Sequence, residues 1–174
     1  MVTKKSLSTF RLAYRIFGST VIMAAISAIL FLTSDVITSN FWVNVIISAL
    51  LIVIYCTMCY NDAFTCGMGD VLPTAKRKPY AAKGAVAGAS VYIIPVILLF
   101  MNAEPYKLWY GFYMMPFRGV FTIFNNSIYV NAAALLIIPI VCGVGYYNGT
   151  KHNDIFERLR TFKNKVVYEE KKHR

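Results

Sequence analysis

Residues 36–61 read VITSNFWVNVIISALLIVIYCTMCYN, a run of 26 residues without a charged side chain. About 20 mostly apolar residues are enough for a helix to cross the hydrocarbon core of a bilayer. An ionised side chain at the bilayer centre costs about 3 kcal/mol, so membrane spans rarely contain one. The stretch therefore predicts a membrane-spanning segment and argues against a water-soluble fold.

Three further charge-free runs have comparable lengths. They cover residues 16–34, 84–103 and 119–150, which are 19, 20 and 32 residues long, and no other such run exceeds ten residues. The number of predicted spans is therefore four and does not depend on a chosen threshold. We place them at residues 14–33, 41–60, 84–102 and 128–147.

The spans are predicted to be helices, because strands of a membrane barrel alternate apolar and polar residues over about ten positions. The run IISALLIVI at residues 46–54 does not alternate. Composition agrees, with 57% hydrophobic and 15% charged residues against about 25% charged in soluble domains. We expect an all-α integral membrane protein with a transmembrane domain at 1–150 and a basic tail at 151–174. A cleaved signal peptide is not favoured, since the uncharged core at 16–34 exceeds the usual 7 to 15 residues.

The placement of positive charge predicts the orientation of the chain. Sixteen of the 18 Lys and Arg lie at the start of the first span, between the second and third spans, or after the fourth. The other two connections hold only Lys107 and Arg118. Positive residues near span ends stay in the cytoplasm, so we expect a cytoplasmic-membrane protein with both termini cytoplasmic. Anionic lipids of the inner leaflet account for the net charge of +10, and no nucleic-acid partner is predicted.

The two outer connections differ in kind. Residues 35–40 are short and polar, which predicts an antiparallel hairpin of the first two spans. Residues 102–127 carry eight aromatic side chains, and Trp and Tyr favour the head-group level of a bilayer. We expect interfacial helices broken near Pro116, with Trp109 and Tyr110 as membrane-surface contacts. A lid, a re-entrant element and a docking surface for a partner are the alternatives.

The tail carries an amphipathic pattern. Ile155, Leu159, Phe162 and Val166 are spaced by four, three and four residues, which places them on one face of a helix. Basic side chains flank this stripe. The pattern predicts a helix on the inner leaflet with Arg158, Phe162 and Lys163 as surface contacts. A docking helix for a soluble partner is the alternative.

Small residues four apart occur in two spans and predict close helix packing. Gly84 and Gly88 open the third span, and Ala24 and Ala28 lie in the first. Their partner helix is either within the chain or in a second subunit.

Uncharged polar residues in the spans suggest one further site. Asn44 and Asn131 are the most polar of them, and both fall in the outer half of the membrane, where they form a candidate polar path. Among Asp, Glu, His, Lys and Arg, only Arg15 lies within a span, which argues against proton-coupled transporters, proton pumps and intramembrane aspartyl proteases. Asp62 and Asp70, assigned to the inner loop, are weak candidates for the metal of a lipid-modifying enzyme.

The cysteines give a weak metal-binding pattern. Cys56, Cys59 and Cys66 cluster near two methionines, and such soft ligands suit Cu(I). Histidine is absent from this cluster, and the second CxxC of a zinc site is missing. We therefore favour helix packing and predict no metal or cofactor. The stretch CGMGD at 66–70 predicts a turn, because it lacks the GK[ST] of a phosphate loop.

The scarcity of catalytic groups favours a non-enzymatic subunit or accessory scaffold of a larger membrane complex, with a protein partner or a second copy of the chain. The alternative is a small transporter or channel component that forms its path as an oligomer. That path would use Asn44, Asn131 and the third and fourth spans, which Pro95 and Pro139 are expected to kink.

Overall fold

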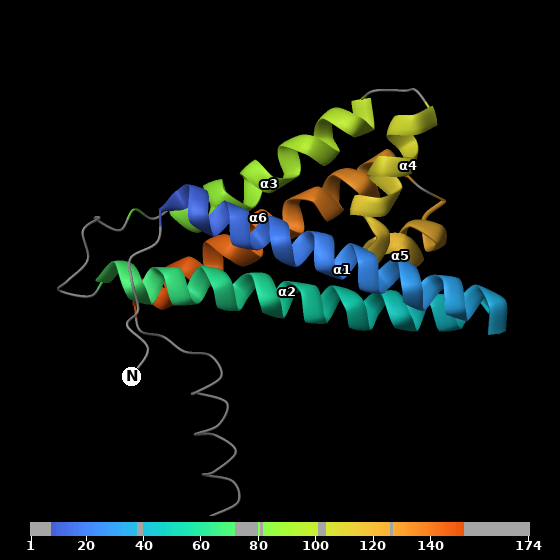
Figure 1. The fold of residues 1–174 in the computed structure, drawn as a ribbon, viewed down its shortest axis with the longest axis horizontal. Helices are drawn as coiled ribbons and strands as arrows, with labels where there is room; N and C mark the ends of the chain where they lie inside the picture. The colour runs from blue at the N-terminus through green and yellow to red at the C-terminus, as the bar shows by residue number, and fades with distance from the viewer. Residues whose placement is uncertain are drawn as a thin grey trace, which may run out of the picture.

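The structure is a computed structural model that describes residues 8–37, 40–71, 80, 82–100, 104–125 and 127–151. Within these residues every regular element is a helix, which confirms the all-α prediction for the described part of the chain (Figure 1). The elements are α1 Thr9–Ile37, α2 Phe41–Val71, α3 Lys83–Phe100, α4 Glu104–Tyr113, the 3-10 helix η1 Met115–Phe117, α5 Arg118–Ile123 and α6 Ile128–Thr150.

Among the described residues, three helices are long and apolar enough to cross a membrane: α1, α2 and α6. With 31 residues, α2 is about 46 Å long at 1.5 Å per residue, against a hydrocarbon core of about 30 Å. The 18 residues of α3 give only about 27 Å. The membrane character of the chain is thus supported by three helices, and the fourth span stays a prediction.

The four long helices form a ring. Its neighbouring pairs are α1–α2, α2–α6, α6–α3 and α3–α1, so α1 lies opposite α6 and α2 lies opposite α3. In Figure 1 the starts of α1 and α3 and the ends of α2 and α6 lie together, at what we call the basic end. The opposite end, where α1 ends and α2 begins, is the hairpin end. This arrangement brings Arg11, Arg15, Lys83 and Lys151 to one end of the bundle.

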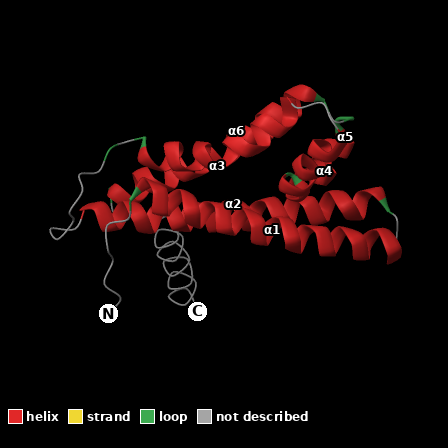
Figure 2. Cartoon of the chain, turned by 45° about the horizontal axis from the view of Figure 1, so that its top comes forward, coloured by secondary structure: helices red, strands yellow, loops and turns green. Residues whose placement is uncertain are grey.

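The ring opens toward the hairpin end. Figure 2 shows α3 and α6 leaning away from α1 and α2 there, with α4 and α5 at the opening. The segment from Met114 to Phe121, which we call the wedge, contacts both α1 and α2. Its residues Met114, Pro116, Phe117 and Phe121 are buried, and the rings of Phe117 and Phe121 stack at 6.2 Å. The middle of the aromatic segment is therefore part of the core, whereas the sequence predicted that it lies along the outer face.

The wedge is seated on the first turns of α2. Ser48 lies seven residues after Phe41, about 10 Å along the helix axis, and its Oγ donates to the carbonyl oxygen of Pro116 at 2.7 Å. A buried break between helices leaves backbone groups that need such partners. A methyl group on Gly119 would lie 2.7 Å from the carbonyl oxygen of Asn44, so only glycine lets the wedge approach this closely.

The second helix is longer than predicted. Residues 61–71 are helical, so the inner loop expected to begin at residue 61 and the turn expected at 66–70 are both wrong. The buried residues Ala63, Cys66, Gly67 and Asp70 repeat at three- and four-residue spacing, and they continue the helical face that packs against the bundle.

Glycines bring α6 close to its two neighbours. A carbon added at Gly149 would collide with the carbonyl of Phe64 on α2, and one added at Gly84 would collide with the carbonyl of Cys142. At Gly88 it would lie 2.9 Å from the Cα of Pro139. Gly84 and Gly88 therefore pack within the chain, against α6. On α1, Ala24 is buried and Ala28 is half-buried.

Candidate functional site

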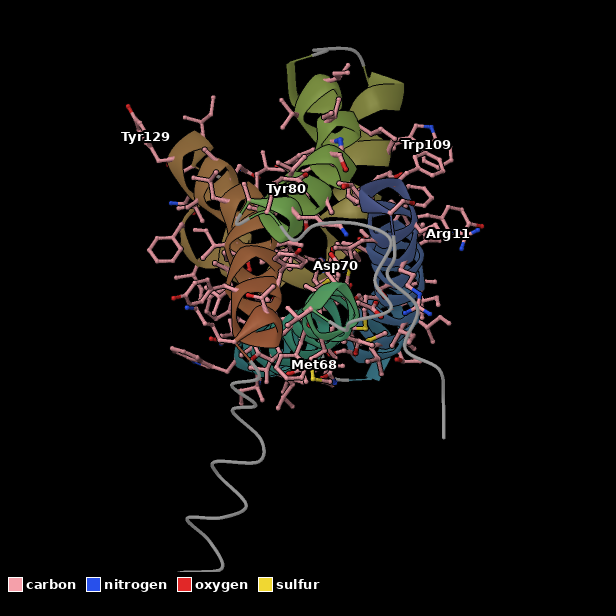
Figure 3. All side chains as sticks on the ribbon, turned by 90° about the vertical axis from the view of Figure 1, so that its left-hand side faces the viewer. Arg11, Met68, Asp70, Tyr80, Trp109 and Tyr129 are labelled. Carbon is pink, nitrogen blue, oxygen red and sulfur yellow. The ribbon has the colours of Figure 1, made fainter. Side chains whose placement is uncertain are left out.

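A buried cluster of ionisable side chains joins three helices at the basic end. Lys83 of α3 donates from its ammonium to the carboxylate of Asp70 on α2, and Tyr146 of α6 donates to the same oxygen at 2.9 Å. The side chains of Lys83 and Asp70 are only 3% and 0% exposed. Figure 3, which views the bundle from this end, places Asp70 in the middle, between the helices. We call these three residues the inner cluster.

The inner cluster holds α2, α3 and α6 together, because each buried charge is compensated by the other. Removing one partner of a buried ion pair leaves an uncompensated charge, which typically costs about 3–5 kcal/mol. The ammonium of Lys83 also lies 5.8 Å from the centre of the Tyr146 ring. The sequence prediction missed this cluster because it assigned Asp70 and Lys83 to a loop. The signal was present, since Asp70 continues the buried spacing of α2 and Lys83 directly precedes Gly84.

Asp62 has partners of its own. Its carboxylate lies 3.9 Å from Arg15 of α1 and accepts a hydrogen bond from Ser19 at 3.3 Å. Eight residues place Asp62 and Asp70 about 80° apart around α2, at 100° per residue. The two carboxylates therefore serve different neighbours and do not form one site. Among the described residues, no three His, Cys, Asp or Glu side chains are grouped as metal ligands.

A chain of buried hydroxyl groups crosses the centre of the bundle. Thr20 donates to the carbonyl of Ile16 at 2.8 Å, which uses its only hydroxyl hydrogen. Tyr55 therefore donates to Thr20 at 2.6 Å, and Tyr92 donates to Tyr55 at 3.1 Å. These hydrogen bonds join α1, α2 and α3, so the three hydroxyl groups stabilise the contacts between helices.

The three clustered cysteines do not converge. Cys56 and Cys66 are ten residues apart on α2, about 15 Å along its axis, whereas zinc–sulfur bonds are about 2.3 Å long. Cys59 faces the neighbouring helix α6, where the thiol of Cys142 lies 3.9 Å from the carbonyl oxygen of Cys59. Cys59, Cys66 and Cys142 are buried and Cys56 is half-buried. These positions are those of packing residues.

A second ionic cluster ties the hairpin to the wedge. Ser34 donates to the side-chain oxygen of Asn44 at 2.9 Å, and the amide nitrogen of Asn44 donates to Asp35 at 3.1 Å. Arg118 of α5 reaches the other oxygen of Asp35 at 2.9 Å. The side chains of Arg118 and Asp35 are 40% and 38% exposed. We call these four residues the outer cluster.

Beside the wedge lies a cavity of about 770 Å³, which we call the outer cavity. Asn131 lines it, accepting from the hydroxyl of Tyr110 at 2.7 Å and donating to the carbonyl of Ser127 at 3.0 Å. Burial raises the pKa of Tyr110 to about 12, so this hydroxyl remains a donor at physiological pH. The full lining is Lys107, Leu108, Tyr110, Gly111, Phe112, Met114, Met115, Arg118, Phe121, Thr122 and Asn131.

The structure places the residues of the predicted polar path and the described residues of the predicted membrane surface in different surroundings. Asn131 lines the outer cavity and Asn44 does not, although Arg118 belongs to both the outer cluster and the cavity lining. Trp109 is exposed and lies at the edge of the bundle in Figure 3, whereas Tyr110 is half-buried. The predicted tail contacts Arg158, Phe162 and Lys163 lie outside the described residues.

Comparison with known proteins finds no matching family model, no matching curated protein and no matching solved structure. Function is therefore inferred from the geometry of the inner cluster, the outer cluster and the outer cavity.

Proposed function

We propose that the chain is a non-enzymatic subunit or accessory scaffold of a larger membrane complex. One observation carries this proposal: the polar groups between the helices are bonded to one another. Among the described residues, no buried side-chain nitrogen or oxygen lacks a hydrogen-bond partner. Asp70, Tyr55 and Asn44 each connect different elements, so they hold the bundle together rather than offering free groups to a substrate.

The proposed topology has four spans with both termini in the cytoplasm. Its support is the basic end, which gathers Arg11, Arg15, Lys83 and Lys151, as the positive-inside tendency requires. The position of α3 between α1 and α6 supports a fourth crossing. A reporter fused after Arg174 should face the cytoplasm, and an exterior reporter would contradict this topology.

The scaffold function is tested by which polypeptides co-purify with the chain. Purification of the tagged chain in mild detergent, with the particle mass measured by light scattering, should give a complex that contains other polypeptides in fixed ratio. The same tag on an unrelated four-span protein is the control. A homo-oligomer would favour the transport alternative below, and a lone monomer would contradict both.

One observation favours a component of a transporter or channel as the second candidate. The side-chain amide of Asn131 lines the outer cavity and so places a polar group beside an open space toward the hairpin end of the bundle. Under this alternative, Asn131→Leu should abolish ion conductance of reconstituted oligomers in planar bilayers. Asn44→Leu, outside the cavity lining, should spare the conductance if only the cavity forms the path.

A further inference from the structure

The outer cavity collects positive charge from a part of the chain that has almost none. Of the 18 Lys and Arg, only Lys107 and Arg118 fall in the two predicted outer connections, residues 35–40 and 102–127. Both line this one cavity. Asp35 already pairs with Arg118, so the meeting of these two cations at one cavity favours an anionic ligand in addition to that carboxylate.

Most of the exposed surface inside the cavity is apolar. Its apolar side chains are Leu108, Phe112, Met114, Met115 and Phe121. Leu108 is 76% exposed and Met114 only 1%, so the cavity runs from an open rim to a buried floor. Its volume is within the range of about 300–1,000 Å³ typical of small-molecule sites. An apolar floor below cationic side chains matches a molecule with a hydrocarbon chain and an anionic head.

Arg118 is suited to a phosphate. Its bond to Asp35 uses the nitrogen Nη2, while a guanidinium carries five N–H donors in a fork that matches phosphate oxygens. The guanidinium carbon Cζ lies over the Phe31 ring, 5.3 Å from its centre, and this contact helps to position the side chain. Lys107 is exposed and adds a second positive charge.

An apolar floor beside two cationic side chains selects a lipid as the occupant. Pro116 of the wedge is bonded to Ser48, about 10 Å along α2 from Phe41, so the wedge lies near the hairpin end. We propose that the outer cavity binds one lipid with an anionic phosphate head group. Its phosphate lies between Lys107 and Arg118, and its acyl chain lies against Met114 and Phe121. The site needs only a membrane surface at the hairpin end and does not depend on the scaffold function.

Two glycines provide a matched pair of variants. Gly111 lines the cavity, and a carbon added to it meets no atom within 4 Å. Gly18 on α1 is equally open and lies outside the lining. Gly111→Phe therefore adds a bulky ring at the cavity lining, and Gly18→Phe adds the same side chain elsewhere. Lys107→Gln is a second test, which removes the charge at an exposed position but keeps a polar side chain.

The experiment is native mass spectrometry of the full chain in detergent, titrated with phosphatidylglycerol or with phosphatidylcholine of identical acyl chains. We expect one phosphatidylglycerol per chain, bound about tenfold more tightly than phosphatidylcholine. Both lipids carry the phosphate, but the choline cation of phosphatidylcholine is repelled by Lys107 and Arg118. Gly111→Phe should lose this lipid, whereas Gly18→Phe should keep it. Lys107→Gln should reduce the preference for phosphatidylglycerol several-fold.

Three results would overturn the proposal. The first is equal binding of the two lipids by the wild-type chain. The second is undiminished phosphatidylglycerol binding by a folded Gly111→Phe variant, or by Lys107→Gln if Gly111→Phe does not fold. The third is displacement of the lipid by excess inorganic phosphate, which would show that the site recognises the free anion alone.

Discussion

The two ends of the bundle use the same chemistry in opposite surroundings. At the basic end, Asp70 and Lys83 form an ion pair that is almost wholly buried, and glycines press α6 against α2 and α3. At the hairpin end, Asp35 and Arg118 form a pair that is more than a third exposed, beside a cavity. The difference teaches that burial, rather than the identity of the charges, decides what an ion pair contributes. One end is closed by its contacts, and the other leaves room for a ligand.

The largest expected difference is between the two ion pairs. Lys83→Met should lower the free energy of unfolding by about 3–5 kcal/mol, because it leaves the charge of Asp70 buried without a partner. Arg118→Met should cost about 1 kcal/mol or less, because Asp35 stays in contact with water. Unfolding in detergent, followed by circular dichroism, measures both. The double variant Asp70→Leu, Lys83→Met is the control and should recover part of the loss; equal losses for the two single variants would remove the distinction between the ends.

A smaller effect is expected from the glycine contacts. Gly149→Ala places a methyl group against the backbone of Phe64, which cannot move aside, and should cost about 1–3 kcal/mol. Gly18→Ala meets open space and should stabilise its helix by up to about 1 kcal/mol. The same unfolding assay compares them. If Gly149→Ala were as stable as Gly18→Ala, the close approach of α6 to α2 would be wrong.

The smallest of the three effects concerns the seat of the wedge. Ser48→Ala removes the hydroxyl that donates to the carbonyl of Pro116 and should cost about 1–2 kcal/mol, since that buried carbonyl loses its partner. Thr33→Ala is the matched control, because its exposed hydroxyl bonds only within α1. Amide hydrogen exchange should speed up in residues 114–121 for Ser48→Ala alone. Unchanged exchange there would show that Ser48 does not hold the wedge.

Much of the helical framework follows from the sequence. A charge-free run locates a span, and the predicted starts at residues 41, 84 and 128 lie within a residue of the observed helices. The end of α2 was missed because a charge ends an apolar run but does not end a helix. Asp62 ended the charge-free run and with it the predicted span, although the residues from Ala63 to Asp70 keep the helical spacing of the buried face. That spacing was the better guide to where the helix ends.

The clusters were harder to predict because they depend on which helices become neighbours. Asp35 and Arg118 are 83 residues apart, and nothing local to either residue indicates the other. The aromatic content of 102–127 predicts contact with a membrane surface, but it does not distinguish Trp109, which is exposed, from Phe117, which is buried. Gly119 was the missing signal, since a glycine beside Phe117 and Phe121 allows that face to sit directly on α2.

The insertion of the wedge between the helices is tested most directly by a cross-link between Ser48→Cys and Gly119→Cys in native membranes. The added Cβ of residue 119 would lie 2.7 Å from both the Cβ of residue 48 and the carbonyl oxygen of Asn44. The wedge must therefore shift outward, and a shift of about 1 Å brings the two Cβ atoms to the about 3.5–4.5 Å of a disulfide. We predict that mild oxidation joins these two positions, as mass spectrometry of the digest would show, and does not join Ser48→Cys to the exposed position of Phe124→Cys. A segment lying along the membrane surface would give no 48–119 product, and that result would contradict the account.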